Sequence, residues 1–133
     1  RGPIALAADK ETVLGLPVLY AAQNPKVLVL VEGPFDALKI TAFGRGLGVY
    51  AAALFGLNVS ESQVVEVLEL SRRFERVCLL LDQGAELHRL RLASLLATAS
   101  PAILSTGDAY EDPGAMDGGA VTDLALRLVA DAC

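Results

Sequence analysis

The 133-residue sequence contains no tryptophan, one histidine and two cysteines. A single histidine, His88, excludes a zinc site built from several histidines. Cys78 and Cys133 are far apart and lack the spacing of metal ligands, and Cys78 stands inside an apolar run, so we expect a small buried side chain there. No apolar run approaches the roughly 20 residues that span a bilayer. No signal-peptide pattern is present either, so we expect a cytoplasmic protein with no membrane partner.

Aromatic residues make up only 5% of the chain although 53% of it is hydrophobic, so the core must consist of Leu, Val and Ala. This composition favours a layered α/β domain and excludes disorder. The net charge is −5, whereas a domain that binds nucleic acid unaided is usually basic. The acidic balance favours a metal site, or neighbouring domains that supply the basic surface. The chain opens on Arg1 rather than Met, and we expect a fragment of a longer protein.

Short apolar runs alternate with segments of helical spacing along the chain. We predict strands at 27–31, 49–55, 76–81 and 102–105, and helices at 34–43, after Ser60, at 85–97 and at 121–130. Because parallel strands are joined by right-handed crossovers, this order predicts an α/β, Rossmann-like fold. Its mostly parallel four-stranded sheet would carry helices on both faces.

Two of these helices have recognisable starting residues. Ser60 and Gln63 form an S-x-x-Q capping box, and Thr122 or one of its neighbours would cap the last helix. In the helix after Ser60, helical spacing predicts an apolar inner face and a charged outer face. The predicted inner residues are Val64, Val65, Leu68 and Phe74, and the predicted outer ones are Glu61, Glu66, Glu69, Arg72 and Arg73.

Acidic residues follow two of the predicted strands. Glu32 comes directly after the first strand, with Asp36 four residues later, and Asp82 follows the third strand. Asp112 belongs to a polar loop after the fourth strand. The carboxyl ends of parallel strands share one edge of the sheet, so these four acids are candidates for a Mg²⁺ site. The alternative is that each acid merely caps the helix that follows it.

The segment VEGPFDALKI at 31–40 resembles the E-G-x-x-D motif of TOPRIM domains, in the form typical of bacterial and phage primases and primase-helicases. Further likenesses follow in the family's order. They are VYAAALFG at 49–56, the D-x-D-like VCLLLDQG at 77–84 and the Glu111–Asp112–Pro113 loop, and VLGLPVL at 13–19 is similar to the segment before the first strand. The resemblance covers about residues 12–125 of a single domain spanning 1–133, with 1–11 as an N-terminal extension.

The resemblance implies a DNA primase-type nucleotidyltransferase, which makes RNA primers during DNA replication with weakly bound Mg²⁺ or Mn²⁺. It implies catalytic roles for Glu32 and Asp82, metal ligation by Glu32, Asp36, Asp82 and Asp112, and a motif glycine at Gly33. The implied partners are a single-stranded DNA template, nucleoside triphosphates, other domains of the parent protein and a replication helicase.

This sequence departs from the family pattern at several positions. Gly84 occupies the place of the second D-x-D acid, Glu111 replaces a lysine, and no acid follows Pro113 closely. Glu86 is a possible substitute ligand. Two alternatives therefore stay open: a catalytically weakened TOPRIM domain with an interaction or regulatory role, and a TOPRIM nuclease or topoisomerase-type domain.

Overall fold

The computed structural model describes residues 21–53, 61–80, 90, 94, 96–97, 102–104 and 116–130. Most of the helix predicted at 85–97 lies outside these residues, as do Ser60 and the ends predicted for the second, third and fourth strands.

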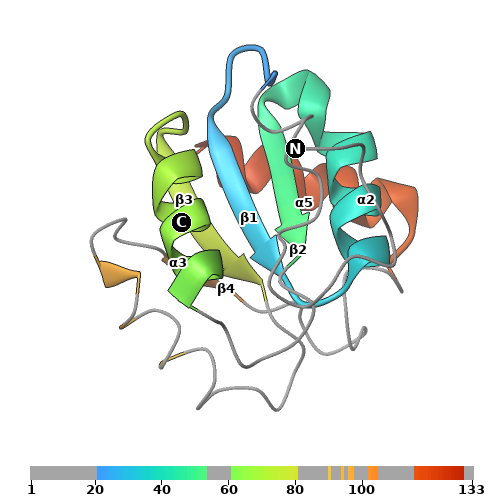
Figure 1. The fold of residues 1–133 in the computed structure, drawn as a ribbon. Helices are drawn as coiled ribbons and strands as arrows, with labels where there is room; N and C mark the ends of the chain where they lie inside the picture. Colours follow the sequence, from blue (N-terminus) through green and yellow to red (C-terminus); the bar gives the residue numbers. More distant parts are fainter. Residues whose placement is uncertain are drawn as a thin grey trace.

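The centre of the fold is a parallel sheet (Figure 1). Strands β1 (Val27–Val31), β2 (Val49–Ala53) and β3 (Arg76–Leu80) have five residues each, and the short β4 (Ala102–Leu104) has three. The spatial order is β2-β1-β3-β4, and every neighbouring pair is parallel. The predicted α/β class and parallel sheet are therefore confirmed.

Strand β1 is an interior strand that is buried on both faces. All five of its residues are 0% exposed. Val27, Val29 and Val31 belong to the core on one face, whereas Leu28 and Leu30 belong to the core on the other. An uninterrupted apolar run is what such a strand requires, because every side chain meets a packed layer.

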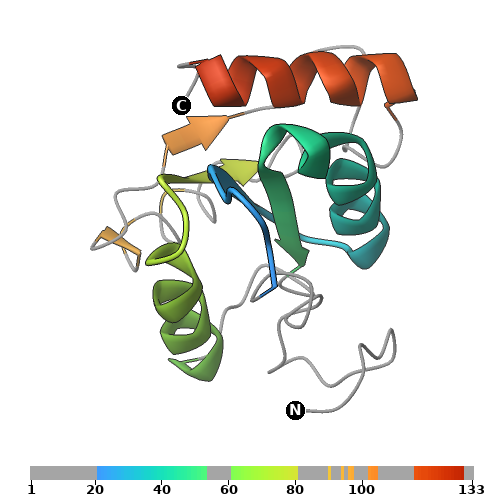
Figure 2. The ribbon, with the colours of Figure 1, turned by 90° about the horizontal axis from the view of Figure 1, so that it is seen from above.

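Helices cover both faces of the sheet. Helices α2 (Pro34–Gly44) and α5 (Gly118–Ala130) pack on the valine side of β1, and α3 (Glu61–Ser71) packs on the leucine side. Figure 2 shows α5 and α3 on opposite sides of the sheet, with α2 beside α5. A short 3₁₀ turn, η1 (Arg45–Leu47), joins α2 to β2.

The inner face of α3 agrees with the prediction in part, because Val64 and Leu68 pack against the core as expected. Gln63, Val67 and Leu70 are buried, whereas Val65, which we expected to face inward, is 60% exposed. Phe74 is buried as expected, just beyond the end of the helix. The buried positions are spaced i, i+4, i+7 and i+11, and a polar residue at the first of them obscured the pattern.

Helix α5 begins three residues earlier than predicted, at Gly118. Its capping side chain is Asp117, whose Oδ1 accepts a hydrogen bond from the backbone N–H of Ala120 at 2.7 Å. Thr122 lies inside the helix, where its hydroxyl donates to the carbonyl of Gly118 at 3.0 Å. Asp117 thus has a structural role of the kind expected for an acid before a helix.

Cys78 is fully buried in β3, as predicted, but it is disulfide-bonded rather than a free thiol. Cys133 lies outside the described residues. Among the residues that are described, no helix has the length and apolar character needed to cross a membrane.

Candidate functional site at the carboxyl edge of the sheet

The motif around Glu32 lies where β1 passes into α2. Glu32 follows the last residue of β1 and is half-buried, and Gly33 is the N-cap residue of α2. Gly33 has φ −108° and ψ 154°, and Pro34 opens the helix at a position that needs no N–H donor. Because this backbone conformation is open to any L-residue, Gly33 is not required to make the turn.

Asp36 lies in the first turn of α2 and is only 9% exposed. Its Oδ2 atom is 3.4 Å from the point where a Cβ on Gly33 would stand, so the carboxylate lies against the Gly33 backbone. The N-terminus of a helix carries partial positive charge, which favours an anion at this position. The largely buried carboxylate of Asp36 therefore lies beside the turn that follows Glu32.

Lys39 is a cation near this site that the motif comparison did not single out. It lies one turn after Asp36 on α2, and its Nζ donates a hydrogen bond to the carbonyl of Met116. Met116 precedes α5, so this contact joins α2 to the beginning of α5. The signal in the sequence was the i, i+3 spacing of Lys39 from Asp36, which puts the two side chains on neighbouring positions of one helix.

The described residues include half of the predicted acidic set. Glu32, Gly33 and Asp36 come together at the carboxyl end of β1. Asp82, Glu86 and Asp112 lie outside the described residues, as does Gly84. Within the described part of the chain, no group of three or more His, Cys, Asp or Glu side chains is arranged to hold a metal ion.

The chemistry of the acid pair suits magnesium. Mg²⁺ is commonly held by one or two carboxylates, and its remaining positions are taken by water and by phosphate oxygens. Glu32 and Asp36 would supply those two carboxylates, from a strand end and from the first turn of the following helix. By ligand type, these two side chains are of the kind that holds a magnesium ion.

Comparisons with known proteins address the fold. No family model matches the chain, and no curated protein matches it. Among solved structures, the chain is similar to the primase fragment of the bacteriophage T7 primase-helicase protein, with a TM-score of 0.58 and 17% sequence identity. The match covers 91% of this chain and 49% of the other, so this chain spans about half the length of that fragment. The protein therefore has a primase-like fold.

Proposed function

We propose that this chain is a primase-type domain of the TOPRIM family that carries out Mg²⁺-dependent nucleotidyl transfer for RNA primer synthesis. The observation that carries the proposal is the placement of Glu32 and Asp36 at the carboxyl end of the interior strand β1. This is the edge at which open parallel sheets bind their ligands. The likeness to a phage primase fragment supports the same assignment.

A bound Mg²⁺ ion would stabilise the charge that develops on phosphate oxygens during the transfer. Glu32 is the candidate acid–base or metal-binding group, because it stands half-buried at the end of the strand. Asp36 would fix the ion from the side of α2, where its own position is restricted by burial. We further propose Asp82 and Asp112 as metal ligands and Asp82 as a second catalytic acid, on the basis of the TOPRIM resemblance.

The template in this proposal is single-stranded DNA and the substrates are nucleoside triphosphates. The chain is about half as long as the primase fragment that it matches. Other domains of a parent protein would then supply most of the affinity for the template, consistent with a net charge of −5 on this chain. A replication helicase is the further partner that the likeness to a primase-helicase suggests.

A second candidate is a domain with this fold that has lost most catalysis and serves as an interaction or regulatory module. The observation that favours it is Gly84, which stands where the D-x-D motif has its second acid. Loss of one carboxylate weakens a metal position, since each negative ligand adds to the attraction for a divalent cation.

Metal titration separates the two candidates. We expect millimolar Mg²⁺ or Mn²⁺ to raise the melting temperature of the chain and to shift NMR resonances around Glu32 and Asp36, because binding to the folded state alone stabilises it. Glu32→Gln and Asp36→Asn should each reduce this effect while the apo protein stays folded. The matched control is Asp123→Asn, which changes an exposed acid on α5.

Activity is the second readout. In a parent protein that makes primers, Glu32→Gln should reduce synthesis by orders of magnitude, whereas Asp123→Asn should leave it unchanged. If the wild-type chain shows no response to either metal, the catalytic proposal fails and the interaction module is favoured. Unchanged primer synthesis in the Glu32→Gln protein would mean that Glu32 has only a structural role.

A further inference from the structure

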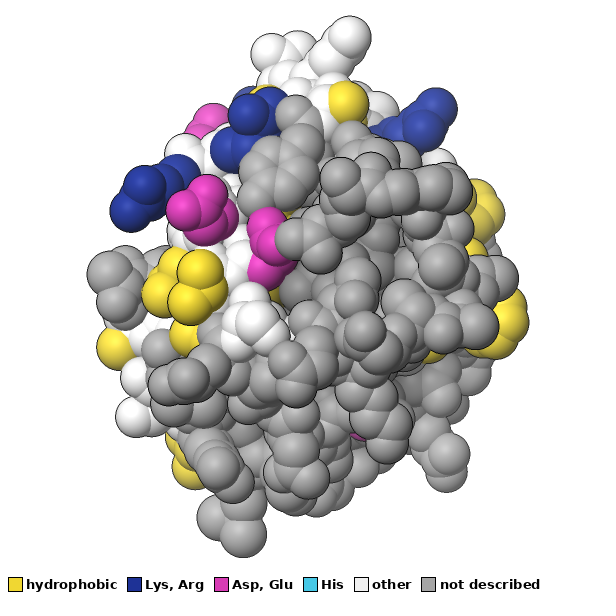
Figure 3. All heavy atoms as spheres, viewed as in Figure 1, with side chains coloured by type: hydrophobic (Ala, Val, Ile, Leu, Met, Phe, Trp, Pro, Cys, Tyr) yellow, Lys and Arg dark blue, Asp and Glu magenta, His cyan; other side chains and the backbone are white. Residues whose placement is uncertain are grey.

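The amino-terminal edge of the sheet, opposite the acid pair, carries most of the positively charged side chains of the described segments. Of the seven Lys and Arg residues in the described part of the chain, six lie at the start of a strand, in the last turn of a helix, or in the short connection between a helix and the strand that follows it. These are Lys26, Arg45, Arg72, Arg73, Arg76 and Arg127. The Lys and Arg side chains visible in Figure 3 gather in the upper part of the molecule, where β1 begins in Figure 1.

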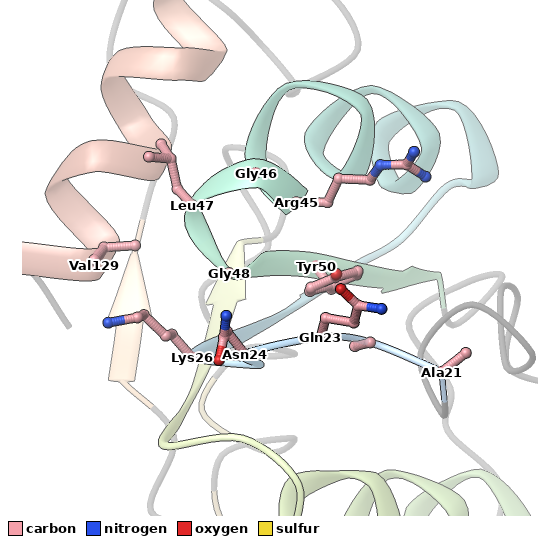
Figure 4. Close-up of a pocket in the computed structure, with 11 residues that line it drawn as sticks. Ala21, Gln23, Asn24, Lys26, Arg45, Gly46, Leu47, Gly48, Tyr50 and Val129 are labelled. Carbon is pink, nitrogen blue, oxygen red and sulfur yellow. The ribbon is translucent and has the colours of Figure 1, made fainter.

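A pocket of about 1000 Å³ opens at this edge, between η1 and the segment that leads into β1. Its volume is in the range of small-molecule sites. Its polar lining comes from Lys26, Arg45 and the amides of Gln23 and Asn24, and its apolar lining includes Leu47, Tyr50 and Val129. In Figure 4, Lys26 and Arg45 stand on opposite sides of the pocket, and Gln23, Asn24 and Tyr50 lie between them.

The backbone of Lys26 is firmly held. Its N–H donates to the carbonyl of Gly48 at 2.9 Å, and its own carbonyl accepts from the N–H groups of Glu75 at 2.9 Å and Arg76 at 3.0 Å. Lys26 thus connects the segments that begin all three five-residue strands. The close approach to Gly48 requires glycine, because a Cβ there would lie 2.7 Å from the carbonyl oxygen of Asn24 and φ is +85°.

The backbone of Arg45 is held in the same manner. Its N–H donates to the carbonyl of Thr41, and its carbonyl accepts from the N–H of Gly48 at 3.0 Å. Both cationic side chains are exposed, and neither makes a hydrogen bond or ion pair with the described residues. Arg76 differs from these two cations, because its Nη2 donates a hydrogen bond to the carbonyl of Val129 at 2.9 Å, in the last turn of α5.

We propose that this pocket binds a phosphate-bearing ligand, either a nucleotide or a strand of nucleic acid, through Lys26 and Arg45. Lys26 and Arg45, which have no side-chain partner among the described residues, supply the positive charge for a phosphate from fixed backbone positions. The side-chain amides of Gln23 and Asn24 add donors, and the apolar wall at Tyr50 and Leu47 suits a planar ring. The charged ends of Lys26 and Arg45 extend outward from the rim of the pocket in Figure 4, and they would turn inward to contact the ligand.

This binding does not depend on the proposed catalytic function. Lys26 and Glu32 stand at opposite ends of β1, six positions apart, which corresponds to roughly 20 Å along a strand. The pocket would therefore hold a phosphate group away from the acid pair. Because the chain as a whole is negatively charged, binding should be weak and should fall steeply as salt is raised.

The test measures binding of three probes to the whole 133-residue chain at low salt without divalent metal. The probes are ATP, inorganic tripolyphosphate and a fluorescent oligothymidylate, with the unlabelled probes also used as competitors. We expect Lys26→Gln and Arg45→Gln each to weaken binding several-fold and the double variant about tenfold or more, since each removes one charge-assisted contact. The affinity for the oligothymidylate should fall less steeply with salt in each variant. The magnitude of the slope of log K against log salt should decrease by about 0.7 per substitution.

Two controls define the site. Arg72→Gln removes an exposed cation at the same edge that does not line the pocket, and it should change binding less than twofold. Glu32→Gln should not weaken phosphate binding at all, so a failed catalytic proposal and a failed pocket give different results. Preference for ATP identifies a free nucleotide as the ligand, and preference for the oligothymidylate identifies a strand. Undetectable binding of all three probes, or equal losses in Arg72→Gln and the double variant, would overturn the proposal.

Discussion

The Oδ2 atom of Asp36 lies 3.4 Å from the position that a Cβ on Gly33 would occupy. That separation is an ordinary van der Waals contact, and the φ and ψ of Gly33 suit any L-residue. We therefore expect Gly33→Ala to change the free energy of unfolding by less than about 1 kcal/mol. The added methyl group would nevertheless stand beside the carboxylate, so the metal-induced rise in melting temperature should become smaller. Denaturation with and without Mg²⁺ measures both effects, and a loss of several kcal/mol without metal would contradict this account.

Gly44 is a glycine that packing requires. A Cβ there would lie 2.9 Å from the Cβ of Val49 and 3.1 Å from the Val49 carbonyl oxygen, at the point where α2 meets β2. We expect Gly44→Ala to destabilise the protein by about 1–3 kcal/mol, because a strand backbone cannot move away cheaply. Gly46→Ala is the matched control, since nothing lies within 4 Å of its Cβ position. Chemical denaturation of the two variants tests the difference, and similar stabilities would refute it.

Asp117 caps α5 through its hydrogen bond to Ala120. Replacing it with alanine should lower stability by about 0.5–2 kcal/mol, because an N–H group at the start of the helix loses its acceptor. Asp117→Asn keeps a capping oxygen and should retain most of the stability. Thermal or chemical unfolding distinguishes the two. If the asparagine variant lost as much stability as the alanine variant, the charge rather than the cap would be responsible.

Val67 and Val65 provide a direct comparison of the two faces of α3. Val67 is 1% exposed and Val65 is 60% exposed. We expect Val67→Ala to cost about 1.5–3 kcal/mol, from lost burial and the cavity that remains. Val65→Ala should change stability by less than about 0.5 kcal/mol. Equal effects on the unfolding midpoint would show that the helix packs through a different face.

The fold was more predictable than the site because buried strands leave a strong pattern in the sequence. The run from Val27 to Val31 predicted β1 with the boundaries that the structure has. The inner face of α3 was predicted only in part: Val64 and Leu68 pack against the core as expected, but Val65 is exposed and the polar Gln63 is buried in its place. The cap at Asp117 was not predicted, because the segment before α5 is rich in Gly and Asp and contains several residues that could equally have capped the helix.

Glu32 and Asp36 lie where the sequence places them, next to the predictable end of β1, and their roles in a site remain predictions. The roles of Asp82, Glu86 and Asp112 remain predictions from the family resemblance. The basic pocket could not be predicted from sequence, because its residues come from separate segments that only the turn at Gly48 brings together.

Side chains of opposite charge stand at the two ends of β1. Lys26 stands before the first residue of this strand and Glu32 follows the last, and the other cations of the described segments lie mostly on the side of Lys26. A chain with a net charge of −5 therefore still gathers most of the cations of its described segments at one edge. A phosphate-bearing ligand in the proposed pocket would therefore leave the acid pair, at the other end of β1, open to the metal ion of the proposed function.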